Sequence, residues 1–214
     1  MICMADTIGI EDMGRMIRSA ADKIRAHRDE LSKLDSAIGD GDHGMTITRA
    51  MGIAEKVIAE SEKKELKGLL KDVGWGVMGV DGGATGPLLG SFLMGLSNGV
   101  GEQDEIDCPT LAAMFEAGLA GVRRQSKAQI GDKTLMDALL PAVDAIRQAA
   151  DNGKSLKQAL QDAAQSAEEG AISTKKYKAR FGRAKNLGER TIGSQDPGAT
   201  SMALIFQGFF EGLP

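Results

Sequence analysis

Three aspartates and a histidine lie within nine residues in the stretch KLDSAIGDGDHGMTITRA, residues 33–50. Asp35, Asp40 and Asp42 follow a D-x4-D-x-D spacing, and the last two sit in a glycine-flanked turn. Side chains two residues apart in an extended or turning segment project to the same side, so Asp40 and Asp42 can converge. Three close carboxylates repel one another unless a proton or a cation neutralises them, and oxygen-only ligands suit Mg²⁺, Mn²⁺ or Ca²⁺. From the spacing alone, a divalent-metal site and a solvated loop with an Asp helix cap are equally good interpretations.

His43 follows this cluster at the predicted start of a helix. It could ligate a metal, hydrogen-bond a phosphate, act as a base or cap the helix. Its position favours phosphate contact, because free N–H groups and the positive end of the helix dipole gather at a helix N-terminus. The other histidine, His27, lies within a predicted helix, and we expect it to be a surface or half-buried residue.

Three further glycine-rich stretches contain Asp, Thr or Arg: GVDGGATG (79–86), IGDKT (130–134) and LGERTIGSQDPGATS (187–201). Glycine is favoured where the backbone needs a positive φ or a close approach. Helix-end turns could explain one or two such loops, whereas four indicate one site built from several inter-helix connections. Within them, Thr85 could contact a phosphate or cap a helix. The basic run around Arg183 could hold an anion or form a solvated face.

Apolar residues recur at helical spacing through almost the whole chain, and the pattern predicts about eight helices. The first is expected to extend from Ile10 to Leu31. Pro109 and Ser155 are placed at the starts of two others, as a first-turn proline and an N-cap. Strict apolar–polar alternation is missing throughout, so no strand is predicted. We therefore expect residues 1–214 to form a single all-α domain in the manner of a helix bundle.

The segment GWGVMG, residues 74–79, matches the G-x-G-x-x-G pattern of dinucleotide-binding loops. Helical periodicity precedes it where that pattern requires a strand, and no βαβ unit surrounds it. Tight helix packing is therefore the better interpretation.

Composition narrows the class of protein. The net charge is −4 with acidic and basic residues interspersed, which gives no electrostatic footprint for nucleic acid or an anionic membrane. Cys3 and Cys108 are too few for a disulfide framework or a zinc cluster. The apolar runs all fall short of the roughly 18 residues of a membrane span, and the N-terminal residues lack a signal-peptide pattern. We expect a cytoplasmic protein that interacts with neither nucleic acid nor membrane.

Five stretches, in their order along the chain, resemble the L subunit of dihydroxyacetone kinase, which is the nucleotide-binding subunit of that enzyme. They are LDSAIGDGDHG, GGATGPLLG, IGDKTLMDALLPA, GRAKNLGERTIG and DPGATS. The resemblance runs over almost the whole chain and implies a barrel of eight antiparallel helices. It implies that ADP or ATP binds in loops at one end through two Mg²⁺ ions held by Asp35, Asp40 and Asp42. The nucleotide contacts it implies come from His43, Gly44, Met45, Thr46, Ala84, Thr85, Leu135, Arg183, Asp196, Pro197 and Gly198.

The same resemblance implies half of an enzyme. A partner K subunit would hold dihydroxyacetone, and a phosphocarrier M-type subunit could recharge a resident ADP in place of free ATP. The chain would be a phosphotransferase subunit in glycerol metabolism, with Arg183 as the candidate catalytic residue that stabilises phosphate charge. Thr85 stands where the family usually has Ser, which keeps the hydroxyl. Two alternatives stay open: a kinase subunit for another short ketose such as erythrulose, and an ADP-loaded regulatory protein that signals to a transcription factor.

Overall fold

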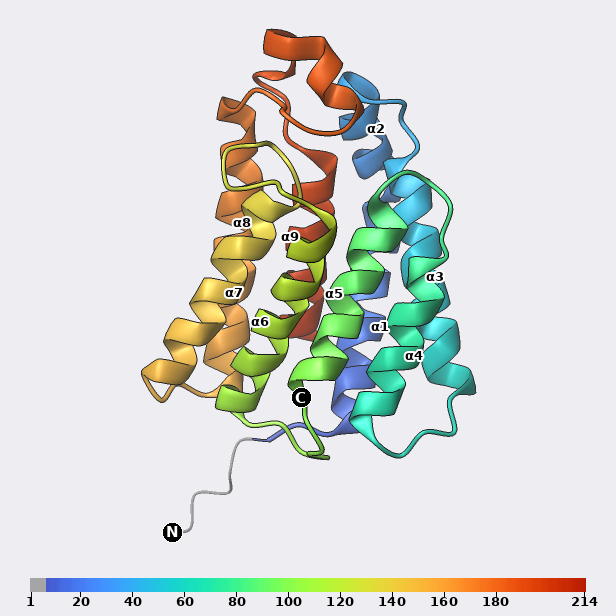
Figure 1. The fold of residues 1–214 in the computed structure, drawn as a ribbon, viewed down its shortest axis with the longest axis vertical. Helices are drawn as coiled ribbons and strands as arrows, with labels where there is room; N and C mark the ends of the chain where they lie inside the picture. The colour runs from blue at the N-terminus through green and yellow to red at the C-terminus, as the bar shows by residue number, and fades with distance from the viewer. Residues whose placement is uncertain (1–6) are drawn as a thin grey trace.

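The computed structural model describes residues 7–214, and eight of its helices form a closed ring (Figure 1). Each ring helix packs against the next, and the last returns to pack against the first. The all-α prediction is confirmed: residues 7–214 contain no strand, only an isolated antiparallel bridge between Ile8 and Ile106. The ring consists of α1 (Ile10–Ala26), α3 (His43–Glu60), α4 (Leu66–Met78), α5 (Thr85–Gly99), α6 (Cys108–Gln125), α7 (Met136–Asp151), α8 (Leu156–Ser173) and α9 (Pro197–Glu211).

The first predicted helix is in fact two helices. α1 ends at Ala26, and α2 (Arg28–Ile38) begins after His27, the residue that caps both. α2 leaves the ring and packs at its end against α3 and α9. The prediction of one helix through Leu31 was wrong because the apolar stripe continues across the break, with Ile24 and Leu31 both buried. His27 is half-buried, as expected.

The ring helices alternate in direction, so every second connection lies at the same end of the bundle (Figure 1). Connections 39–42, 79–84, 126–135 and 174–196 meet at one end, the upper one in the figure. The last of them contains two short 3-10 helices, η1 (Thr174–Lys176) and η2 (Arg183–Thr191). These four connections hold the four glycine-rich stretches. Alternating helix direction therefore gathers segments that are far apart in the sequence.

The interior of the ring is filled by side chains. Phenylalanines of α5, α6 and α9 contact one another there, with the ring centroids of Phe115 and Phe206 lying 5.5 Å apart. Glycines let the helices approach closely: a Cβ on Gly208 of α9 would overlap the Cα of Ala20 in α1. Gly74 is packed in the same way against Gly90 of α5, so tight helix packing is the correct interpretation of the GWGVMG segment.

Cys108 is buried at the start of α6, whereas Cys3 lies outside the described residues. No helix within residues 7–214 is long and apolar enough to cross a membrane.

Candidate functional site

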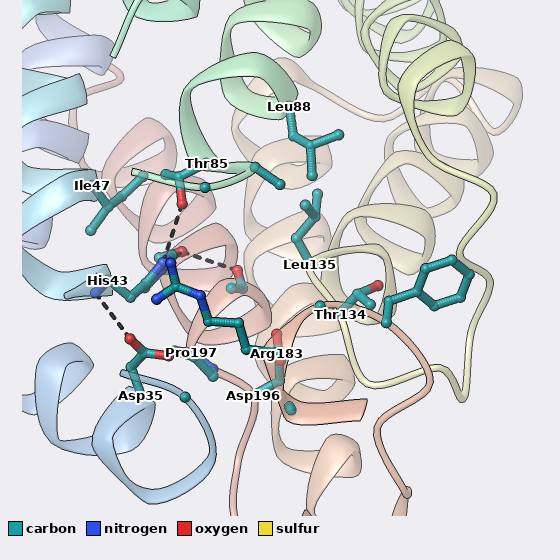
Figure 2. Close-up of a pocket in the computed structure, with 18 of the residues that line it drawn as sticks. Asp35, His43, Ile47, Thr85, Leu88, Thr134, Leu135, Arg183, Asp196 and Pro197 are labelled. Carbon is teal, nitrogen blue, oxygen red and sulfur yellow. Dashed lines mark hydrogen bonds between the residues drawn. The ribbon is translucent and has the colours of Figure 1, made fainter. Parts of the chain in front are cut away.

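A cavity of about 480 Å³ lies among the four glycine-rich connections (Figure 2). Residues from all four line it, together with parts of the helices that the connections join. Polar groups include the three clustered aspartates, while Ile47, Leu88 and Leu135 add apolar surface. The cavity can therefore hold a ligand that has both a charged and an apolar part.

Four ring helices begin at this end of the bundle: α3, α5, α7 and α9. A helix N-terminus presents free backbone N–H groups and the positive end of the helix dipole. His43, Thr85, Leu135 and Pro197, which lie at or next to these four starts, all line the cavity. The backbone thus favours an anionic ligand, although three carboxylates at the same place would repel it. A cation bound between the carboxylates and the ligand would remove this repulsion.

Asp35, Asp40 and Asp42 each offer a carboxylate oxygen, and these oxygens lie within 4.8 Å of one another. Asp35 is largely buried in the last turn of α2, and its Oδ2 accepts a hydrogen bond from the His43 N–H at 3.2 Å. Asp40 and Asp42 are exposed in the following turn, where Gly41 has a φ of +83°. Two oxygens bound to the same Mg²⁺ lie about 3–4 Å apart. The type and spacing of these three carboxylates therefore fit a magnesium site.

Arg183 forms an ion pair with Asp40. Its position follows from the turn before η2, in which Gly182 adopts a φ of +62°. This ion pair joins the α8–α9 connection to the α2–α3 turn. It also supplies one positive charge to a cluster of three carboxylates.

His43 links three helices at the cavity wall (Figure 2). Its Nε2 lies 3.0 Å from the Ser201 Oγ of α9, and its Nδ1 lies 3.4 Å from the Thr85 Oγ1 of α5. Burial lowers the pKa of His43, although the nearby charge of Asp35 and the carbonyl group of Pro197 act in the opposite direction. The neutral imidazole is therefore the favoured form, suited to hydrogen bonding.

The structure places most of the other candidate residues at the cavity. Ala84, Asp196 and Gly198 line it beside the residues already described. Of the segment His43 to Thr46, only His43 lines the cavity. The remaining candidates of that segment have other surroundings: a Cβ on Gly44 would overlap the Arg28 carbonyl oxygen of α2, the Met45 side chain is 60% exposed, and Thr46 is buried against Gly82.

Three polar residues near the cavity were not singled out from the sequence: Lys133, Asp137 and Ser201. All three are buried. Burial lowers the pKa of Lys133 and raises the pKa of Asp137. Burial also raises the pKa of Asp196 to about 7. The stretch IGDKT was recognised as a loop, but nothing in its sequence shows that its lysine points inward.

Together, the fold and the site define a class: an all-α barrel in which three clustered carboxylates and four helix N-termini meet around a cavity at one end. Residues 37–211 match the family model of the DAK2 domain. The chain therefore belongs to the DAK2 domain family.

Several known proteins are similar to this chain. The PEP-dependent dihydroxyacetone kinase 1, ADP-binding subunit DhaL, of Listeria innocua is 36% identical over 92% of this chain and 93% of its own length. The corresponding ADP-binding subunit of Escherichia coli is 39% identical over 83% of this chain and 84% of its own. L-erythrulose kinase of Pectobacterium atrosepticum is 34% identical over 88% of this chain, but only 32% of that longer protein is covered. The native dihydroxyacetone kinase of C. freundii shares the fold, with a TM-score of 0.72 and 24% identity over 92% of this chain and 34% of its own.

Proposed function

We propose that this chain is the ADP-binding subunit of a dihydroxyacetone kinase. The observation that carries the proposal is the meeting of three carboxylates with four helix N-termini around one cavity. Two relatives are named as such subunits. The match covers 93% of the Listeria innocua subunit and 84% of the Escherichia coli subunit. A nucleoside diphosphate bound with a divalent cation satisfies both sets of groups, because the cation neutralises the carboxylates and the phosphates meet the helix starts.

In this proposal Asp35, Asp40 and Asp42 hold two Mg²⁺ ions. The ions, when bound, supply the charge neutralisation and orientation on which phosphoryl transfer depends. His43 and Thr85 contribute hydrogen-bonding groups to the phosphates. The segment His43 to Thr46 contributes through its backbone N–H groups at the start of α3, which accounts for the outward direction of the Met45 side chain.

The remaining wall of the cavity suits the nucleoside. Leu135 and Pro197 offer apolar contacts, and Gly198 leaves room beside them, since a Cβ there would lie 3.5 Å from the Leu135 nitrogen. Arg183 is the catalytic residue of the proposal: its guanidinium, now paired with Asp40, is close enough to the cluster to stabilise developing phosphate charge.

The phosphoryl acceptor, dihydroxyacetone, is held on a partner K subunit, so the chain is active as a phosphotransferase only in that complex. The donor is a phosphocarrier M-type subunit that recharges the bound ADP, as the name "PEP-dependent" of the two subunit relatives suggests, with Mg-ATP as the alternative. The similarity to L-erythrulose kinase favours erythrulose as the second candidate acceptor.

Titration calorimetry with Mg-ADP tests the nucleotide site. We expect saturable binding that requires Mg²⁺, and absence of binding at high micromolar nucleotide would leave only a solvated acidic loop.

Mixing the chain with a matching K subunit, and with either Mg-ATP or a phosphorelay, should phosphorylate dihydroxyacetone. ADP that stays bound through dialysis points to the relay, whereas ready exchange points to ATP. A pull-down that recovers a transcription factor without kinase complementation would favour the regulatory alternative.

A further inference from the structure

Lys133, in the connection between α6 and α7, has an unusual backbone and a buried side chain. Its φ is +62°, and it is the only non-glycine residue with a positive φ within residues 7–214. L-amino acids other than glycine avoid this conformation because the Cβ crowds the following carbonyl group. Lys133 is nevertheless only 2% exposed. Glycine would fit this backbone better, so the lysine side chain itself must contribute something that offsets the strain.

The ammonium group of Lys133 joins three segments of the chain. Its Nζ donates to the carbonyl oxygen of Thr174, 2.7 Å away at the end of α8, and to the carbonyl oxygen of Ser194. The Thr174 hydroxyl in turn accepts a hydrogen bond from the Asp196 N–H at 2.9 Å. The acceptors of Lys133 lie 41 and 61 residues further along the chain. One buried cation therefore fixes the α6–α7 connection against both ends of the α8–α9 connection.

Two buried carboxylates, Asp137 and Asp196, act electrostatically on this ammonium and favour its charged form against the cost of burial. Asp137 accepts hydrogen bonds from the N–H groups of Gly131 (2.6 Å) and Thr134 (2.8 Å), which holds the connection around Lys133. Asp196 accepts from the Ala199 N–H at 2.7 Å and so caps α9. Each carboxylate thus organises one of the two helix starts that Lys133 connects.

These two helix starts form adjacent parts of the cavity wall (Figure 2). A Cβ on Gly198 would lie 3.1 Å from the Asp196 carboxylate and 3.5 Å from the Leu135 nitrogen, so the start of α9 closely approaches the start of α7. We propose that Lys133 is a positioning residue for the nucleotide, setting the spacing between Leu135 and the segment Asp196 to Gly198. This inference rests on the proposed function, since it concerns the ligand that those residues would contact.

Calorimetry with Mg-ADP on three variants of the full chain tests the role of the ammonium. Lys133→Met keeps an unbranched side chain out to Cε but leaves two carbonyl groups without their donor, and we expect affinity to fall about tenfold or more. Lys133→Gly relaxes the backbone but also lacks the ammonium, so we expect a similar loss. Lys133→Arg keeps a cation with several donors, and its affinity should stay closer to that of the wild type than either of the others.

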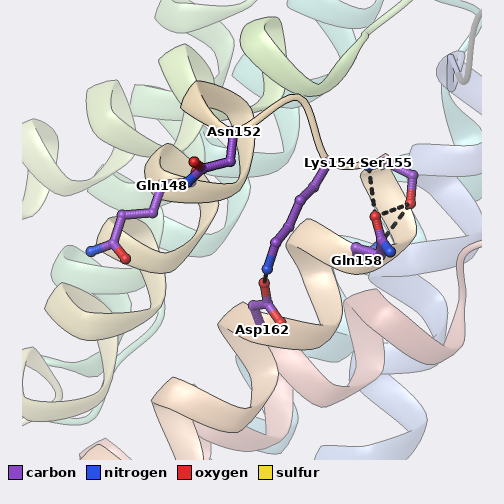
Figure 3. Close-up of polar contacts among 6 residues, drawn as sticks. All are labelled: Gln148, Asn152, Lys154, Ser155, Gln158 and Asp162. Atoms are coloured by element: carbon purple, nitrogen blue, oxygen red, sulfur yellow. Dashed lines mark hydrogen bonds and ion pairs between the residues drawn. The ribbon is translucent and has the colours of Figure 1, made fainter.

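Two further variants serve as controls. Lys154→Met is the same substitution at the opposite end of the bundle, where the Lys154 Nζ lies 2.7 Å from Asp162 (Figure 3), and it should leave the affinity for Mg-ADP unchanged. Leu160→Ala empties a fully buried position of α8, and it should lower the melting temperature without changing affinity. This second control separates a loss of stability from a loss of nucleotide positioning.

Binding of Mn²⁺ in the absence of nucleotide separates the proposed role from a general structural defect. A general defect would weaken the binding of both Mn²⁺ and Mg-ADP. Because Lys133 acts on the nucleoside side of the cavity, Lys133→Met should bind Mn²⁺ about as tightly as the wild type while its affinity for Mg-ADP falls. Equal affinity of wild type and Lys133→Met for Mg-ADP would overturn the inference. So would a Lys133→Gly variant that binds like the wild type, or a parallel loss of Mn²⁺ and ADP binding. A wild-type chain that binds no Mg-ADP would instead overturn the proposed function itself.

Discussion

Arg183 and Asp40 form an ion pair that connects two segments of the cavity rim more than a hundred residues apart in sequence. Asp40 is one of the three clustered carboxylates, so the guanidinium supplies a charge that a metal ion would otherwise supply. In the proposed site, a metal ion and Arg183 would therefore compete for Asp40 when no nucleotide is bound. Phosphate groups would end this competition, because they can accept from Arg183 while their oxygens complete the coordination of the metal.

This competition predicts opposite changes in two affinities for Arg183→Met. Without nucleotide, Mn²⁺ should bind a few-fold more tightly, since Asp40 is free of its partner. Mg-ADP should bind about tenfold or more weakly, because a charge-assisted contact to phosphate is lost. Calorimetry measures both affinities, and Arg190→Met, an exposed change in the same α8–α9 connection, is the matched control. A parallel fall or rise of both affinities would contradict the competition.

Asp40→Asn should strongly weaken the metal-dependent binding of ADP. It keeps the size of the side chain but removes one of the three negative charges, and we expect affinity for Mg-ADP to fall at least about 100-fold, since even indirect partners of metal ligands are worth 10–100-fold. Phosphorylation of dihydroxyacetone in the presence of the partner subunits should fall with it. The control is Asp72→Asn, which removes the same charge from an exposed position of α4. Normal phosphorylation by Asp40→Asn would refute the metal assignment.

The raised pKa of Asp196 predicts a pH-dependent stability. Burial raises this pKa from 3.8 to about 7, so the folded state holds a proton that the unfolded state has released. The contribution of Asp196 to the free energy of unfolding is complete below about pH 4. It is lost as the pH rises towards 7, because the unfolded chain then releases the proton that the folded chain still holds. Asp196→Asn keeps an oxygen for the Ala199 N–H but does not ionise. Its free energy of unfolding, measured in urea from pH 4 to 8, should gain on that of the wild type by a few kcal/mol as the pH rises. A difference independent of pH would contradict the shift.

The close contact of Gly208 with α1 predicts that adding one methyl group at this position strongly lowers the stability of the fold. Gly208→Ala would place a Cβ in the backbone of Ala20, and the helices must separate to admit it. We expect the free energy of unfolding to fall by about 1–3 kcal/mol. Gly52→Ala is the matched control: no atom lies within 4 Å of the added Cβ, and the better helix former should stabilise α3 by up to about 1 kcal/mol. Equal effects of the two changes would show that close packing is unimportant.

Local signals in the sequence predicted much of the architecture. Helical periodicity predicted the all-α fold, and two helix starts were also recognised. Ser155 accepts from the Gln158 N–H at the start of α8 (Figure 3). Pro109 lies in the first turn of α6. The glycine-rich stretches were correctly grouped, because each lies between helices and the helices alternate in direction. The break at His27 could not be predicted, since burial continues on both sides of it.

Other parts of the site depend on contacts that no local pattern encodes. Lys133 becomes a buried cation only because the carbonyl groups of Thr174 and Ser194 reach it from distant segments. Ser201 reaches His43 only because α9, which closes the ring against α1, also contacts α3. The resemblance of short motifs likewise implies nucleotide contacts from the segment His43 to Thr46, but it does not show that the Met45 side chain is exposed.

The close helix contacts also determine which parts of the chain can respond to a bound ligand. Gly208 against Ala20, and Gly95 against Ala117, leave neighbouring helix backbones no space in which to slide. Amide hydrogen exchange in the middle of α5 and α9 should therefore proceed at the same rate with and without nucleotide. The connections 39–42 and 126–135 should exchange more slowly once the cavity is filled. A protein that docks on this end of the barrel would then detect bound nucleotide through the connections alone, because the helices of the barrel do not change.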